Sequence, residues 1–244
     1  MTFRAEQQPL GTFYASAAGR LLLRRLFYLI NACWPSLENK RLLTVGYATP
    51  FIRFFQEKHP ASLTEVDVDS DGEKTLALKT TETAFPFRDK TFDAVFVVNT
   101  LEKSAFPDML FSELRRILND DGTLLLVRAN RQTPWSCLKN TPVVTGTLYT
   151  ERQIRRLMRK NVMTVTRRKQ TLFFPKAVYD LSPLAEKTEE TLAELPFGGA
   201  FSATLAVKTP AVEETAPFYA KMKKAVFVPT ADSQRNITET SLKK

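Results

Sequence analysis

The most constraining feature of the chain is an apolar strand, a helix and a second apolar strand that follow one another in its centre. Residues 92–98 (FDAVFVV) form an apolar run behind the polar turn at residues 88–90. Apolar residues then recur at helical spacing in residues 110–118, and the turn at residues 119–122 leads into a second apolar run at residues 123–127. Two buried strands joined by a helix at this spacing form a parallel crossover unit. The sequence therefore predicts an α/β fold with a parallel sheet.

The residues before this unit continue the alternation of strands and helices. The strands predicted there are at residues 41–45, 63–68 and 75–79. Thr49 is predicted to cap the helix after the first strand, and Pro50 suits the first position of that helix, where a backbone N–H is not needed. This alternation predicts a doubly wound sheet. On such sheets ligands bind outside the carboxyl ends of the strands, where the strand order reverses.

An amphipathic helix is predicted at residues 14–32, before the first strand. Its apolar face holds Leu22, Leu26, Leu29, Ile30 and Cys33, and the basic residues that point to the other side are Arg20, Arg24 and Arg25. A basic amphipathic helix can lie on a membrane surface. Packing on the sheet of its own domain explains the same pattern and is the interpretation that we adopt. The chain contains no run of 18 apolar residues, so no transmembrane segment is predicted.

The second half of the chain is predicted to begin with a long loop at residues 128–148. A capping box formed by Thr150 and Gln153 then opens a helix with Ile154 facing inward. The remaining predicted elements are two strands, a helix and a last strand, at residues 162–166, 171–174, 184–195 and 201–208.

Composition and periodicity divide the 244 residues into three parts. Residues 1–12 are polar and are predicted to be loose, and residues 13–210 are predicted to form one domain. Residues 211–244 are predicted to be a flexible tail, because they are rich in Thr, Ala, Glu and Lys and lack apolar periodicity.

Two stretches of the central segment follow the pattern of a known family: AFPFRDKTFDAVFVVNTLEK and, further along, ELRRILNDDGTLLLV. They resemble the central part of class I S-adenosylmethionine-dependent methyltransferases of the small-molecule, type 11 kind. The resemblance covers roughly residues 41–127. It implies a Rossmann-like, mostly parallel sheet of seven strands, S-adenosylmethionine as the cofactor, and methyl transfer to a small-molecule acceptor.

The resemblance also implies which residues meet the methionine part and the ribose of the cofactor. The family has three glycines in the turn after the first strand, whereas this chain keeps only Gly46, followed by Tyr47. Ala48 can replace a glycine there if its φ is negative. Thr44 stands where the family has an acidic residue. Asp67, at the end of the second strand and expected to be an exposed carboxylate, would accept hydrogen bonds from both ribose hydroxyls.

The adenine and the transferred methyl group are assigned to residues after the third and fourth strands. Thr81 and Glu82 stand where the family contacts the adenine. Asn99 and Leu101 stand where the family lines the methyl-transfer end of the site. The acceptor would then lie under the N-terminal helix and the long loop, which makes Tyr14 and Trp135 the candidate substrate residues.

Several other kinds of chemistry are disfavoured by the composition. His59, the one histidine, precedes the second strand and so lies at the amino-terminal edge of the sheet. A metal site, a Ser/His/Asp triad and a histidine base are therefore not predicted, and no catalytic residue is assigned. Cys33 and Cys137 form no CxxC pair, so they indicate no disulfide framework and fit a reducing cytoplasm.

The charge of the chain leaves an alternative partner open. The net charge is +9, and residues 152–169 contain eight basic residues and no acidic one. Such a surface can bind RNA, although aromatic residues that stack on bases are not interleaved in this run. Three hypotheses follow: a small-molecule methyltransferase, a binding or scaffold protein that keeps the fold after its glycine turn has decayed, and an RNA methyltransferase or RNA binder that uses Arg152–Lys169.

Overall fold

The computed structural model describes most of the chain up to residue 209. The described residues are 10–34, 36–68, 78–81, 84–130, 142–144, 146–174, 176–181, 184–195 and 198–209. The internal contacts divide the chain into two units, Met1–Thr209 and Pro210–Lys244. The predicted tail at residues 211–244 lies outside the described residues. The domain boundary predicted at residue 13 falls within the first helix, α1 (Leu10–Ala15).

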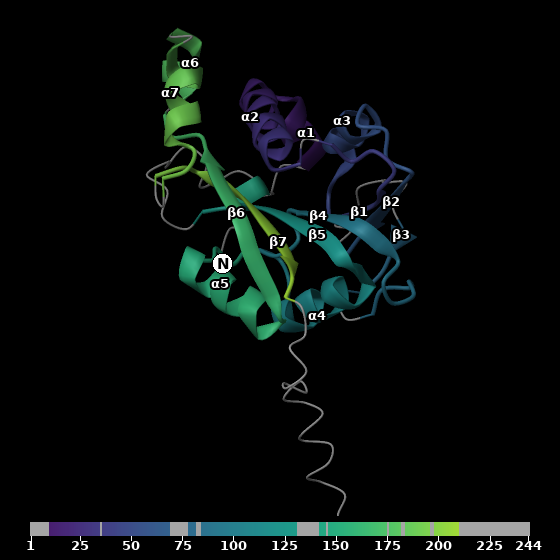
Figure 1. The fold of residues 1–244 in the computed structure, drawn as a ribbon. Coiled ribbons are helices and arrows are strands. Elements are labelled where there is room, and N and C mark those ends of the chain that lie inside the picture. Colours follow the sequence, from purple (N-terminus) through teal and green to yellow (C-terminus); the bar gives the residue numbers. More distant parts are fainter. Residues whose placement is uncertain are drawn as a thin grey trace, which may run out of the picture. The chain divides into compact units, whose positions relative to one another are not determined.

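Within the described residues, seven strands form one sheet in the order β3-β2-β1-β4-β5-β7-β6 (Figure 1). Their bounds are β1 Arg41–Val45, β2 Ser62–Asp67, β3 Leu78–Lys79, β4 Phe92–Val98, β5 Leu118–Ala129, β6 Met163–Thr171 and β7 Phe201–Lys208. All neighbouring strands are parallel except that β7 runs antiparallel to both β5 and β6. The predicted doubly wound, mostly parallel, seven-stranded sheet is confirmed.

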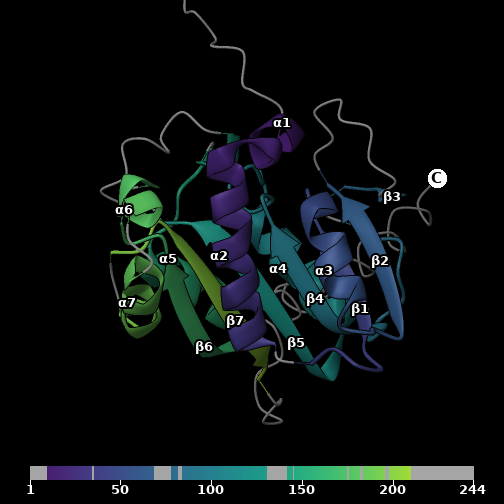
Figure 2. The same cartoon turned by 90° about the horizontal axis from the view of Figure 1, so that it is seen from above.

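Helices cover both faces of the sheet (Figure 2). Side chains alternate between the faces along each strand, so Leu42 and Phe96 pack with α1, α2 and α3, whereas Leu43 and Val95 pack with α4 and α5. The helices after α1 are α2 Ala17–Cys33, η1 Thr49–Phe51, α3 Ile52–Gln56, α4 Pro107–Ile117, η3 Pro142–Val144, α5 Glu151–Lys160, α6 Lys176–Leu181 and α7 Leu184–Leu192. None of the helices in the described residues is long and apolar enough to cross a membrane.

The N-terminal helix packs on the sheet, as we expected, and its predicted apolar face is buried. The single helix predicted at residues 14–32 is wrong, because the structure has two helices that meet at Ser16. The Ser16 hydroxyl accepts a hydrogen bond from the Gly19 N–H at 3.1 Å and so begins α2. This break separates α1 from the long helix that covers β6 and β7.

Arg25 is also misplaced by the sequence analysis, which put it on the exposed side of the helix. It is buried, and its Nε lies 3.1 Å from Glu189 Oε2 on α7. The Glu189 carboxylate also accepts hydrogen bonds from the Thr171 hydroxyl, the Leu172 N–H and the Tyr179 hydroxyl. A buried guanidinium is tolerated there because a fully hydrogen-bonded carboxylate compensates its charge.

Two strand boundaries differ from the prediction. The turn predicted at residues 119–122 is part of β5, and a register shift between Phe92 and Ala94 absorbs the extra residues in the pairing with β4. The two short strands predicted at residues 162–166 and 171–174 are one strand, β6, which pairs with β7 along its length. Charged residues are typical of an edge strand, and the basic residues between the two predicted strands concealed its continuity.

Smaller differences concern helix ends. Thr49 does not cap a helix through its side chain. Instead its hydroxyl donates to Glu65 Oε1 at 3.4 Å, because that carboxylate on β2 lies beside it. The predicted capping box at Thr150 is confirmed. Helix α6 was not predicted, and the predicted helix at residues 184–195 ends earlier, at Leu192.

The buried pair between α2 and α7 generates the first prediction. Arg25→Met should lower the free energy of unfolding by about 3 kcal/mol, because Glu189 loses its charged partner while it stays buried. Denaturant unfolding at neutral pH measures this change. Arg24→Met, at the neighbouring exposed position of the same helix, should change the free energy of unfolding by less than about 0.5 kcal/mol. Equal effects of the two substitutions would contradict the prediction.

Candidate functional site

The turn after β1 is built around Gly46. Its φ is +91°, and a Cβ at this position would overlap the Thr100 hydroxyl and the Val98 carbonyl oxygen. The Gly46 N–H donates to the Val66 carbonyl at 2.8 Å, and the Thr100 hydroxyl lies 3.3 Å from the Val45 carbonyl. Both the left-handed backbone and the missing side chain are therefore required where the ends of β1, β2 and β4 meet.

The other positions of this turn adopt conformations that do not require glycine, although the family has two further glycines there. Ala48 is fully buried, with φ −97° and ψ −4°. Gly46 alone has a positive φ among residues 46–50, all of which the structure describes. Pro50 stands at the start of η1, where its ring fits the helical φ. The condition stated for Ala48, a negative φ, is met, so the loss of two glycines leaves the path of the backbone unstrained.

Asp67 is the last residue of β2 and lies beside this turn. It is 5% exposed, so the expectation of an exposed carboxylate is wrong. The second strand includes Asp67, as predicted, but Asp67 also pairs with Lys79 on β3 and accepts the Thr80 N–H at 3.2 Å through its carbonyl oxygen, which places the residue inside the sheet. A carboxylate in this position is held by the sheet itself and does not depend on a loop.

The residues predicted to contact the adenine lie mostly at the margin of the described structure. Thr81 is exposed and forms a short antiparallel bridge with Ala84, whose N–H lies 3.4 Å from the Thr81 carbonyl oxygen. Glu82 lies outside the described residues, as does Trp135, one of the two predicted substrate residues.

The other predicted substrate residue, Tyr14, lies against two predicted cofactor residues. The Asn99 side-chain amide donates to the Tyr14 hydroxyl at 3.0 Å, and the Tyr14 ring stacks on the Tyr47 ring with centroids 6.1 Å apart. Asn99 has φ +54°, a conformation that asparagine adopts more readily than most residues. Burial raises the pKa of Tyr14 well above its usual value. Helix α1, the turn after β1 and the end of β4 therefore meet at one point.

Leu101, the last of the predicted cofactor residues, is fully buried among the side chains that pack with α4 and α5. It therefore belongs to the core on that face of the sheet. Its neighbour Glu102 was not singled out in the sequence. One signal could have indicated it: Glu102 is a carboxylate in the turn that follows β4, and the carboxyl end of β4 lies at the predicted site.

Glu102 is a buried carboxylate with one hydrogen-bonded oxygen. Its Oε1 accepts the Ala129 N–H at 3.1 Å, whereas Oε2 has no hydrogen-bond partner among the described residues. The backbone around it is fixed, since its carbonyl oxygen accepts the Thr147 N–H at 2.6 Å and lies where a Cβ on Gly146 would be. Burial raises the pKa of Glu102 from 4.5 to about 7.

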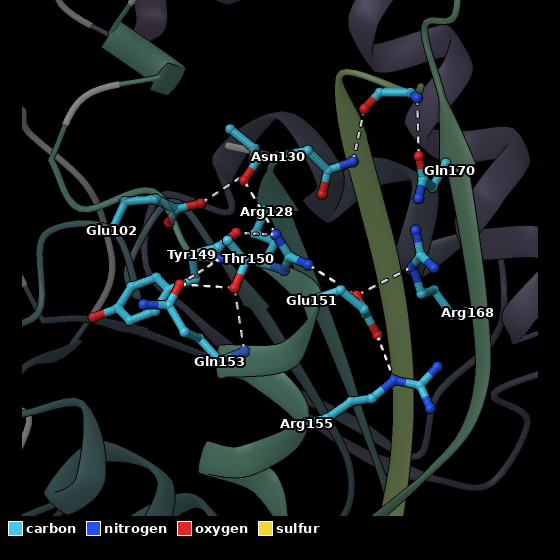
Figure 3. Close-up of polar contacts among 12 residues, drawn as sticks. Glu102, Arg128, Asn130, Tyr149, Thr150, Glu151, Gln153, Arg155, Arg168 and Gln170 are labelled. Atoms are coloured by element: carbon cyan, nitrogen blue, oxygen red, sulfur yellow. Dashed lines mark hydrogen bonds and ion pairs between the residues drawn. The ribbon is translucent and has the colours of Figure 1, made fainter. Parts of the chain in front are cut away.

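A chain of polar contacts leads from this point along β5 to α5 (Figure 3). The Arg128 side chain is buried, and its guanidinium donates to the Tyr149 carbonyl at 2.9 Å and pairs with Glu151 at 3.0 Å. The Glu151 carboxylate also pairs with Arg155 and Arg168. These contacts fix the beginning of α5 against β5 and β6, and they neutralise Arg128 on the side away from Glu102.

Comparisons with known proteins agree with this geometry. Residues 38–126, which span β1 to most of β5, match the family model described as "Methyltransferase domain" (Methyltransf_11). The predicted resemblance to class I S-adenosylmethionine-dependent methyltransferases is thereby confirmed over this segment. No curated protein matched the chain.

Solved structures extend the agreement beyond this segment. A SAM-dependent methyltransferase from Thermotoga maritima, a possible histamine N-methyltransferase, is 18% identical with a TM-score of 0.59, over 82% of this chain and 94% of its own. A SAM-dependent methyltransferase from Archaeoglobus fulgidus is 14% identical with a TM-score of 0.60, over 81% and 98%. The [4+2]-cyclase SpnF is 14% identical with a TM-score of 0.53, over 80% and 85%. Identities this low establish a shared fold, which carries more than one chemistry.

The raised pKa of Glu102 generates the second prediction. A carboxyl group with a higher pKa in the folded than in the unfolded chain contributes stability that is complete below the unfolded pKa and lost as the pH rises through the folded pKa. Between pH 5 and pH 8, wild type should therefore lose about 2–3 kcal/mol of unfolding free energy relative to Glu102→Gln. Denaturant unfolding at both pH values measures the difference. The exposed control Glu38→Gln should follow wild type, and parallel pH profiles of wild type and Glu102→Gln would contradict the prediction.

The conformation of the turn after β1 generates the third prediction. Gly46→Ala should lower the free energy of unfolding by about 2–3 kcal/mol, because the added methyl group meets backbone and Thr100 and the left-handed φ is unfavourable for alanine. Ala48→Gly, two residues away, should cost only about 1 kcal/mol, through backbone entropy. Thermal and denaturant unfolding measure which of the two variants loses more unfolding free energy. A larger loss in Ala48→Gly than in Gly46→Ala would show that φ at position 46 does not control the turn.

Proposed function

We propose that this protein is an S-adenosylmethionine-dependent methyltransferase that acts on a small-molecule acceptor. The observation that supports this most strongly is the register of the central strands: Val45 pairs with Val66 on one side and with Val97 on the other. Gly46 and Asp67 therefore lie next to each other at the carboxyl edge of the sheet, with the end of β4 beside them. This edge is the point where the strand order reverses, which is where such sheets bind their ligands.

The residues at this edge fit the cofactor that the family implies. The buried Asp67 carboxylate would accept hydrogen bonds from the ribose hydroxyls, and the backbone at Gly46 and Tyr47, where a side chain on Gly46 would fill the turn, would meet the methionine part. Thr81 and Glu82 remain the proposed contacts of the adenine. When bound, the cofactor supplies a methyl group on a positively charged sulfur, which needs no further activation.

The chain's own contribution to methyl transfer is then to position the acceptor and to exclude water. Asn99 follows β4, where the family places the transferred methyl group, and its hydrogen bond to Tyr14 holds α1 at this point. The stacking of the Tyr14 ring on the Tyr47 ring holds the same helix over the turn after β1. Alignment of two reactants in a closed site supplies most of the acceleration for a transfer of this kind. We therefore propose that the acceptor enters beside α1, near η3, which contacts that helix.

The other two hypotheses receive less support. A scaffold protein with a decayed site was suggested by the missing glycines, but position 46 is the one position in residues 46–50 with a positive φ, and it has kept its glycine. RNA binding through Arg152–Lys169 requires free cations. Five of the eight basic residues there are engaged: Arg155 and Arg168 with Glu151, Lys160 with Asp108, Lys169 with Glu194, and Arg167 with the Ala32 carbonyl.

The proposal is tested by cofactor binding. Wild type should bind S-adenosylmethionine and S-adenosylhomocysteine in a calorimetric titration, and Asp67→Asn should weaken both by about 10- to 100-fold, because the ribose hydroxyls lose a charged acceptor. Asparagine keeps the size of the buried side chain, which separates binding from folding. The matched control is Glu65→Gln, which removes a carboxylate two residues earlier on the same face of β2 and should change the affinity less than threefold.

The possible outcomes separate the hypotheses. Absence of binding to wild type at millimolar concentrations of either ligand would reject the methyltransferase and favour the scaffold protein. Equal losses in Asp67→Asn and Glu65→Gln would show a general effect of charge and would remove Asp67 from the site.

A further inference from the structure

Glu102 is a buried carboxylate of the described residues that the proposed function does not yet use. It stands three residues after Asn99, in the turn between β4 and α4, and its side chain reaches β5 to accept the Ala129 N–H. Burial raises the pKa of the Tyr14 hydroxyl, and the negative charge of Glu102 raises it further. Glu102 and Asn99 both stand in the turn between β4 and α4, and Asn99 is hydrogen-bonded to Tyr14.

Within the described residues, no cation forms an ion pair with Glu102, although the charges of Arg128 and Lys103 act on it. Its Oε2 has no hydrogen-bond partner there, although the residue is only 6% exposed. The guanidinium of Arg128, whose charge acts on Glu102, is paired with Glu151. Figure 3 shows this arrangement, with Glu102 on one side of Arg128 and Glu151 on the other. Buried carboxylates are normally paired or fully hydrogen-bonded, so this oxygen is suited to a ligand that carries a positive charge or an N–H group.

We propose, on the basis of the proposed function, that Glu102 binds an ammonium group of the methyl acceptor and takes up its proton, so that the acceptor is a small amine. The ammonium nitrogen gives one proton to the Glu102 carboxylate, and its freed electron pair attacks the methyl carbon. The new N–C bond forms as the C–S bond breaks. The electrons of the C–S bond go to sulfur, which leaves as a neutral thioether. The product is an N-methylammonium ion, and Glu102 releases its proton to solvent before the next turnover.

The environment of Glu102 suits this role. The charged and titratable groups that face it are Arg128 on β5, Lys103 in its own turn and Tyr14 on α1. With a pKa of about 7 in the free protein, Glu102 is ionised to about 10% at pH 6 and about 90% at pH 8. It can therefore both bind a cation and hold a proton within the physiological range.

The experiment uses two ligands that differ at the position of the methyl group. S-Adenosylhomocysteine has a neutral thioether there, whereas sinefungin carries an amine on the carbon that replaces sulfur, and this amine is protonated at both pH values. Titration calorimetry at pH 6 and pH 8 gives the ratio of their affinities for wild type, for Glu102→Gln and for the exposed control Glu38→Gln. Glutamine keeps an oxygen for the Ala129 N–H.

For wild type and Glu38→Gln, the preference for sinefungin over S-adenosylhomocysteine should rise about five- to tenfold from pH 6 to pH 8, as Glu102 ionises. For Glu102→Gln the preference should be lower and independent of pH, while the affinity for S-adenosylhomocysteine stays within threefold of wild type.

Three results would overturn the proposal. In the first, wild type binds S-adenosylhomocysteine but prefers sinefungin to the same extent at both pH values. The proposed methyltransferase function then stands, and Glu102 has no part in its chemistry. This comparison uses wild type alone, so it tests the role of Glu102 even if Glu102→Gln does not fold. A pH-dependent preference that persists in Glu102→Gln assigns the titration to another group. Wild type that binds neither ligand rejects the proposed function, and the role of Glu102 with it.

Discussion

The close approach of the β1 turn to the end of β4 is the contact on which the rest of the site depends. Gly46 has no side chain at the point where Thr100 and the Val98 carbonyl fill the space, and its N–H is bonded to β2. Three parallel strands are thereby held together where they end. The carboxylate that ends β2 and the amide that follows β4 come to lie at the same edge because β1 pairs in register with both strands. A side chain at position 46 would separate the strands and disperse the site.

The sequence predicts the central strands well and the periphery poorly, for one physical reason. The strands at residues 41–45, 92–98 and 201–208 were predicted with their observed bounds, since they are largely buried and most of their residues are apolar. Edge strand β6 is exposed to water on one side and accepts Arg and Lys, so its composition does not indicate a strand. The burial of Arg25 depends on Glu189, more than 160 residues away, and no local pattern contains that information.

The residues of the candidate site also fall into those that the sequence could indicate and those that depend on the packed structure. Gly46 and Asp67 stand at strand ends and could be placed from these ends alone. The count of glycines was less informative, because it does not show which position of the turn has a positive φ. Glu102 could not be evaluated in the sequence. Its relevance depends on the burial of one oxygen and on the pairing of Arg128 with another residue, and both are properties of the packed structure.

The extent of the family match has a structural meaning of its own. It ends at residue 126, just before Arg128, and it begins after α1, so it contains the strands that carry the proposed cofactor residues. The contacts outside it come from α1 with Tyr14 and from the end of β5 with its links to α5. Glu102 connects the two parts, because it lies within the matched segment while its side chain accepts the Ala129 N–H at the end of β5, beyond that segment. The matched strands therefore carry the residues proposed for the cofactor, and the proposed acceptor would meet residues from both parts.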